Sequence, residues 1–153
     1  MRKNKPLLML LLPLIVAWMV VWLPVYGTWR LGSSIVLRVW FRMRHVSRGR
    51  TILFVYSNSP NWQQYVEANL LPRVSNRALV LNWSERRNWS RWEGGFFDRF
   101  AGSREFNPAA LVYRPGGGVD VIRFHQAFLD FKHGNDALLR AAEAELSLAL
   151  GPR

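Results

Sequence analysis

The sequence predicts a mixed α/β protein in which an N-terminal transmembrane helix precedes one small three-layer domain with the element order β-α-β-α-β-β-α. Three observations lead to this prediction. Residues 7–25 form an uncharged apolar run. Beyond Arg50, short β-branched and aromatic runs alternate with segments whose apolar residues recur at helical spacing. The chain has 153 residues, so about a hundred remain for a domain with a single core.

The apolar run is long enough to cross a bilayer. At about 1.5 Å of rise per residue its helix measures roughly 28 Å, close to the ~30 Å hydrocarbon core. Trp18, Trp22, Tyr26 and Trp29 gather toward its C-terminal end, and aromatic rings prefer the headgroup region. We therefore expect residues 1–27 to be an uncleaved, single-pass signal-anchor. The alternative is a signal sequence that is removed, but the residues after the run make a poor cleavage site.

Positive charge is concentrated beside this anchor. The net charge is +11, and residues 1–50 carry nine Lys or Arg and no acidic residue. This distribution favours an anionic membrane surface over a nucleic acid as partner, at roughly 1 kcal/mol per basic residue near the headgroups. More basic residues follow the span than precede it, which favours a cytoplasmic domain. The membrane-surface basic residues would be Arg30, Arg38, Arg42, Arg44, Arg48 and Arg50.

Residues 28–50 are expected to form a basic amphipathic segment between anchor and domain. Its apolar side chains recur at helical spacing, which predicts an interfacial helix lying in the headgroups. Packing of this helix on the domain is the alternative. The apolar face would consist of Ile35, Val36, Val39, Trp40 and Met43.

Residues 51–153 are expected to form the α/β domain. Buried strands are predicted at 51–57 and 78–83, and an antiparallel pair at 109–114 and 119–124 around a turn of glycines. The predicted helices begin at Ser59-Pro60 and stop before Pro72, begin at the capping-box pair Ser90 and Glu93, and begin at Asn135 or Asp136. The last of these would bury Leu138, Leu139, Ala142, Leu146 and Leu150. Residues 125–133 are expected to be a loop or short turn.

This element order resembles the thioredoxin-fold family, and the second half of the domain resembles it in detail. Asn107-Pro108 opens the third strand, which is followed by a glycine turn, a fourth strand and a terminal helix. In that family a cis proline precedes the corresponding strand and faces the active site, so Pro108 resembles its counterpart. The family's Cys-x-x-Cys motif is replaced by residues 57–62, and the chain has no cysteine at all. The resemblance therefore implies a redox-inactive module that binds other chains.

The absence of cysteine also excludes disulfides, thiolate metal sites and a thiol-disulfide oxidoreductase. The loop after the first strand is the first candidate site, because open α/β sheets bind ligands at the carboxyl ends of their strands. Its hydroxyls and amides suit a peptide or a small polar ligand. The alternative is that Ser59-Pro60 only starts a helix and Trp62 is a core residue. The predicted groove comprises Ser57, Asn58, Ser59, Asn61, Trp62 and Pro108.

A second candidate surface combines tryptophan and arginine, the residues that dominate interface hot spots. It would contact a partner protein or the membrane, unless its tryptophans are partly buried at a strand end and a helix start. Two triplets here, 82–84 and 88–90, also match the N-glycosylation pattern, which matters only in a eukaryotic lumen. Its residues are Trp83, Arg86, Arg87, Trp89, Arg91 and Trp92.

Polar residues in the second half of the domain support a rival, enzymatic hypothesis. His125, Asp130 and His133, with Asp120, have the side chains of metal ligands or of a general base, but their spacing matches no metal motif. No metal and no cofactor is therefore expected. The sequence favours a membrane-anchored, redox-inactive domain that binds a membrane or envelope protein, or another ligand, at the bilayer surface. The alternative is a membrane-associated enzyme acting on an envelope or lipid-linked substrate through Ser57, Asn58, His125 or Asp130.

Overall fold

The computed structural model describes residues 5–102 and 107–151, with side chains from residue 12 onward. The chain forms two units, Met1–Val36 and Leu37–Arg153. The fold is mixed α/β, with one long apolar helix at the N-terminus and a four-stranded sheet in the second unit. The second unit begins inside the long helix, at Leu37.

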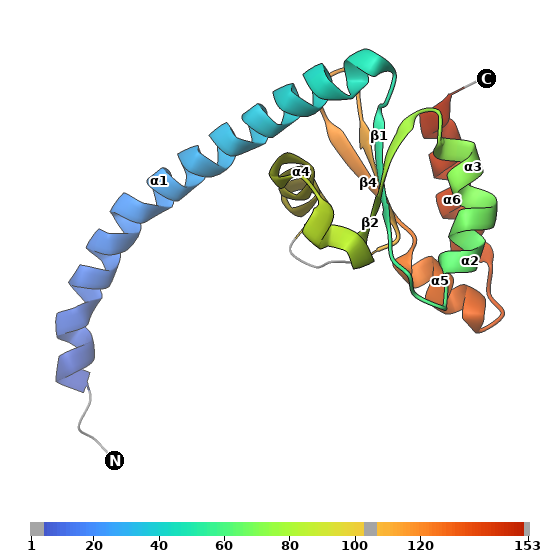
Figure 1. The fold of residues 1–153 in the computed structure, drawn as a ribbon. Helices are drawn as coiled ribbons and strands as arrows, with labels where there is room; N and C mark the ends of the chain where they lie inside the picture. The colour runs from blue at the N-terminus through green and yellow to red at the C-terminus, as the bar shows by residue number, and fades with distance from the viewer. Residues whose placement is uncertain (1–4, 103–106, 152–153) are drawn as a thin grey trace. The chain divides into compact units, whose positions relative to one another are not determined.

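Helix α1 runs from Lys5 to Arg44 and contains both Pro13 and Pro24 (Figure 1). Among the residues that the structure describes, it is the one helix long and apolar enough to cross a membrane. It passes through Gly27 without a break, so the predicted anchor and the predicted amphipathic segment share one helix. A short 3₁₀ turn, η1 (Val46–Arg48), follows it.

The sheet has the strand order β2-β1-β3-β4. Strand β1 (Ile52–Tyr56) pairs in parallel with β2 (Ala78–Asn82) and antiparallel with β3 (Ala109–Tyr113), which pairs antiparallel with β4 (Val119–Arg123). All four strands were predicted. Strand β2 was expected to be buried but is an edge strand, and four of its five residues are only half-buried.

One face of the sheet is covered by a helical stretch and by two C-terminal helices (Figure 1). The stretch consists of α2 (Gln63–Tyr65), a π-helical turn η2 (Val66–Leu70) and α3 (Leu71–Val74). The prediction that Pro72 ends this helix is wrong. The Leu71 N–H bonds to the Val66 carbonyl, and such a wide turn leaves room for the proline ring one residue later.

The prediction of a loop at residues 125–133 is also wrong. Helix α5 (His125–Lys132) lies there, and it forms because Ala127 and Phe128 bury one face against the sheet. Helix α6 (Ala137–Leu150) was predicted, and Leu139, Ala142 and Leu146 are buried as expected. Leu138 is exposed instead, and Leu150 is half-buried.

The other face of the sheet is covered by α4 (Arg91–Ala101) and by the last turns of α1. The predicted capping box of Ser90 and Glu93 is present at the start of α4. Phe41 of α1 is only 1% exposed, and its ring stacks on Phe96 at 4.3 Å between centroids. The end of α1 is therefore part of the core of the domain.

This contact uses a side of the helix that the sequence did not identify as apolar. The side chains that meet the domain are Leu37, Phe41 and His45, with Trp40 half-buried beside them. The face expected to lie in the headgroups is largely uncovered, and its exposed members are Ile35, Val36, Val39 and Met43. For the last turns of α1, the alternative of packing on the domain is the one that the structure supports.

Candidate functional site

The predicted loop of residues 57–62 lies at the carboxyl end of the parallel strand pair. Tyr56 of β1 is in register with Asn82 of β2, so the chain leaves both strands at the same edge. Asn82 Nδ2 donates to Asn58 Oδ1 at 2.6 Å, and the Asn58 N–H donates to Ser84 Oγ at 3.0 Å. The Ser84 N–H in turn donates to Asn82 Oδ1 at 3.0 Å. These exposed polar groups form a small network that joins the loop to the start of η3 (Trp83–Asn88).

Pro108 lies at the base of the same loop. Val55, two residues before the loop, pairs with Ala109, so Asn107 and Pro108 directly precede the end of β3 that lies against the end of β1. The Asn107–Pro108 peptide bond is cis, and both residues are buried. Asn107 Oδ1 is enclosed and has no hydrogen-bond donor among the described residues. Sequence reasoning named Pro108 but not Asn107 as part of the site.

Trp62 belongs to the core rather than to an open binding surface. It is 8% exposed, it lies in the cluster beneath α5, and its ring meets the edge of His125 at 5.6 Å. Its Nε1 donates to Ser57 Oγ at 3.3 Å, so the Ser57 hydroxyl accepts a hydrogen bond from a core residue. Asn61 is exposed, and its Oδ1 accepts from Lys132 Nζ at 3.3 Å. Ser57 and Trp62 therefore position the loop, whereas Asn58 and Asn61 face solvent.

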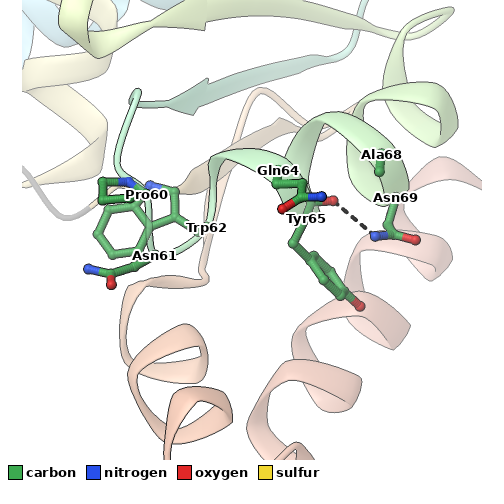
Figure 2. A pocket seen from close by; sticks show the side chains of 7 residues that line it. All are labelled: Pro60, Asn61, Trp62, Gln64, Tyr65, Ala68 and Asn69. Carbon is green, nitrogen blue, oxygen red and sulfur yellow. Dashed lines mark hydrogen bonds between the residues drawn. The ribbon is translucent and has the colours of Figure 1, made fainter.

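An open hollow of about 320 Å³ lies where this loop enters the first helical stretch (Figure 2). The Tyr65 hydroxyl is engaged, because it donates to Glu143 Oε1 at 2.6 Å. Burial, and then this hydrogen bond, raise the pKa of Tyr65 to about 12. Asn69 Nδ2 donates to the Tyr65 carbonyl within the helix. The hollow offers mainly uncharged amides to a ligand, and it is lined by Pro60, Asn61, Trp62, Gln64, Tyr65, Ala68 and Asn69.

The tryptophan and arginine surface is only partly available to a partner. Trp83 and Trp89 are half-buried against Phe97, and Trp89 Nε1 donates to the Asn82 carbonyl at 3.1 Å. The Arg86 guanidinium lies over the Trp83 ring at 5.1 Å. These three side chains mainly hold η3 on the domain. The exposed members of the predicted surface are Arg86, Arg87, Arg91 and Trp92, with Trp92 stacked on Trp40 at 5.7 Å.

The predicted membrane-surface arginines are exposed, with one exception. Arg38 is half-buried, and its guanidinium lies 5.2 Å from the ring centroid of Phe100. Its Nε is enclosed without an acceptor among the described residues. Arg38 therefore helps to attach α1 to α4. The exposed members of the predicted membrane-surface group are Arg30, Arg42, Arg44, Arg48 and Arg50.

Of the residues proposed for an enzyme, Ser57 and His125 both contact Trp62, whereas the acidic candidates are engaged elsewhere. Asp130 accepts from Gln126 Nε2 at 2.9 Å, and Asp120 forms an ion pair with Arg114. His133 is exposed at the end of α5. Within the described ranges, no group of three or more His, Asp or Glu side chains is arranged to hold a metal ion. The glycine-rich segment after Arg114 is the turn of the β3–β4 hairpin, closed by a hydrogen bond from the Arg114 N–H to the Gly118 carbonyl.

Comparisons with known proteins supply no relative from which a site can be transferred. No family model, no curated protein and no solved structure matches this chain. The candidate site therefore depends on the contacts described above.

Proposed function

We propose that this chain is a single-pass membrane protein whose cysteine-free, thioredoxin-like domain binds a peptide segment of a membrane or envelope protein at the bilayer surface. The 40-residue helix α1 and the positive charge that follows its apolar part support the anchoring. The order β2-β1-β3-β4, with one parallel and two antiparallel pairs, supports the thioredoxin-like assignment.

The observation that carries the proposal is the position of loop 57–62. It leaves β1 next to the end of β2, and Pro108 directly precedes the β3 residue that pairs with Val55 of β1. The groups that it exposes are amides rather than a thiol or a carboxylate. Amides donate and accept hydrogen bonds as a peptide backbone does, so they suit the binding of a chain better than acid–base or redox chemistry.

The anchoring is tested by extraction of membranes that contain the full-length protein. We expect the protein to remain in the membrane fraction in high salt and in alkaline carbonate, and to be released only by detergent. Salt screens electrostatic attraction but does not remove a helix from hydrocarbon. Release by salt alone would contradict the anchor.

Binding at the loop is tested by site-specific photo-crosslinking in intact membranes. A photoreactive residue in place of Asn58 or Asn61, both exposed, should give one discrete adduct. The matched control carries the same residue in place of Ala144, an exposed position on α6. Adducts of equal yield and pattern at all three positions would contradict a binding site at this loop.

The excess of basic residues after the apolar run supports a cytoplasmic position for the domain. Because the chain contains no cysteine, a single Ser147→Cys substitution on exposed α6 gives an unambiguous label site. In sealed cells, we expect a membrane-impermeant maleimide to label this variant only after the cytoplasmic membrane is opened. Labelling in intact cells would contradict the cytoplasmic position.

A further inference from the structure

The last turns of helix α1 carry apolar side chains on two opposite sides. Leu37 and Phe41 pack on the domain, and Phe41 is almost completely buried. At 100° per residue, Val39 and Met43 project from the other side of the helix. They are 50% and 73% exposed, so the described domain does not cover them.

This exposed side continues along α1 with regular spacing. Trp29, Gly32, Val36, Val39 and Met43 follow one another in alternating steps of three and four residues. All five are exposed, whereas the arginines of this stretch occupy other positions. A seam repeating every 3.5 residues is typical of helices that pair side by side. We call these five residues the α1 seam.

Gly32 provides a second and independent observation. Glycine inside a helix costs about 1 kcal/mol relative to alanine, so it usually has a packing reason. A Cβ at Gly32 would have no heavy atom of the described chain within 4 Å, so nothing here requires the glycine. A small residue on a helix seam lets a second backbone approach closely.

The length of α1 places the C-terminal part of the seam outside the hydrocarbon core of the bilayer. At about 1.5 Å per residue, forty residues extend roughly 60 Å, about twice the hydrocarbon thickness. The helix continues past the apolar run without a break, so Val36, Val39 and Met43 lie beyond the residues that suffice to span the membrane. Beyond the hydrocarbon core no lipid tails cover apolar side chains, which favours a protein cover.

We propose that the α1 seam pairs in parallel with the α1 seam of a second copy of this chain. The inference rests on the anchoring in the proposed function, because two copies inserted in one bilayer share the same orientation and are confined to one plane. The domain packs on the opposite side of the last turns of α1, so pairing leaves the domain's own contacts with Leu37 and Phe41 intact. Only Arg42 directly flanks the seam near its C-terminal end, which limits repulsion between the copies.

The absence of cysteine makes cross-linking a clean test. Val36→Cys, Val39→Cys and Met43→Cys each place one thiol on the seam of the full-length protein in membranes. The matched controls are Leu31→Cys and Arg44→Cys, at exposed positions on the flanks of the same helix. Two cysteines with Cα atoms more than about 7 Å apart do not form a disulfide, so mild oxidation should give about tenfold more dimer at seam positions.

A second substitution separates pairing from random collision. Val39→Asp in the Val36→Cys background buries a carboxylate at the seam, and we expect it to lower the dimer yield about tenfold. Leu31→Asp in the same background is the control and should leave the yield unchanged. Both positions are exposed in the single chain, so neither change disturbs the fold of the domain.

Three outcomes would overturn the pairing. Equal cross-linking at seam and control positions indicates collision. Seam cysteines that resist both cross-linking and a water-soluble maleimide, but react with a lipid-soluble one, lie in the bilayer instead. In both cases retention in alkaline carbonate leaves the anchoring intact. Release of the protein by salt would remove the anchoring and the parallel pairing together.

Discussion

The two faces of the sheet are closed in different ways. One face is covered by helices that all follow β1 in the sequence: the stretch from α2 to α3, then α5 and α6. The other face is covered by α4 and by Phe41 from the end of α1, with Leu37 and Trp40 packed around it. The first face is therefore complete within residues 51–151, whereas the second needs the end of the long apolar helix α1. Helix α1 and the domain therefore share one structural element.

The largest expected effect comes from removing that element. A fragment of residues 37–153 retains both faces, whereas residues 51–153 lack Phe41 and Leu37. Loss of these side chains costs more than about 5 kcal/mol, which is comparable with the whole stability of a small domain. We expect the shorter fragment to be unfolded by circular dichroism and the longer one to unfold cooperatively in urea. Equal stability of both fragments would contradict the claim that the second face needs the end of α1.

A point substitution sharpens the same comparison. Phe41→Ala should lower the free energy of unfolding of residues 37–153 by about 3–5 kcal/mol, because it opens a cavity beside Phe96. Met43→Ala, two residues away and 73% exposed, is the matched control and should change it by less than about 0.5 kcal/mol. Urea titrations measure both. Similar effects of the two substitutions would show that α1 does not pack as described.

The first face contains a polar contact that joins two of its helical segments. Tyr65 donates to Glu143, which also forms an ion pair with Arg73 at 3.1 Å, so α6 is joined to the first helical stretch. Tyr65→Phe should cost about 1.5 kcal/mol, because it leaves an acceptor of Glu143 without its partner. The measurement is the free energy of unfolding at neutral pH, with Tyr56→Phe, whose hydroxyl makes a longer hydrogen bond, as control.

The same substitution changes the pH dependence of stability. The pKa of Tyr65 is raised from 10.0 to about 12, so in this range the unfolded chain binds fewer protons than the folded one. The contribution of Tyr65 is therefore complete below pH 10 and is lost as the pH rises toward 12. The stability difference between the native protein and Tyr65→Phe should shrink over this interval. A difference that stays constant would contradict the raised pKa.

A smaller effect is expected at the start of α4 on the second face. Ser90→Ala removes the acceptor for the Glu93 N–H and should cost about 1 kcal/mol. Ser147→Ala, whose hydroxyl only donates to a carbonyl of its own helix, should be nearly neutral. If both substitutions were equally harmless, the cap would not contribute to stability.

The strands could be predicted because β-branched and aromatic runs between turn residues leave few alternatives. Residues 51–57 and 109–114 are examples, and both correspond to buried strands of the observed sheet. Helix α5 was missed because its first residue has no side-chain cap and only a short apolar pattern marks it. The predicted helix end before Pro72 was wrong because the π turn that accommodates this proline has no recognisable sequence signal.

The covered side of α1 could not be deduced from periodicity. Apolar residues lie on both sides of its last turns, and Phe41 rather than Val39 meets the domain. Only the tertiary structure decides between two apolar faces. At the candidate site, the loop after β1 was predicted, but the contact of Asn58 with Asn82 and Ser84 was not. The parallel pairing of β1 and β2 would have indicated it, because parallel strands end at the same edge of a sheet.

The shared role of α1 is tested most directly by hydrogen exchange of the full-length protein in lipid nanodiscs. The account predicts that amides near the end of α1, such as the His45 N–H bonded to the Phe41 carbonyl at 2.9 Å, exchange as slowly as those of β1. These amides then open only when the domain unfolds. Exchange of the His45 amide within seconds, while β1 stays protected, would contradict a core that includes the end of α1.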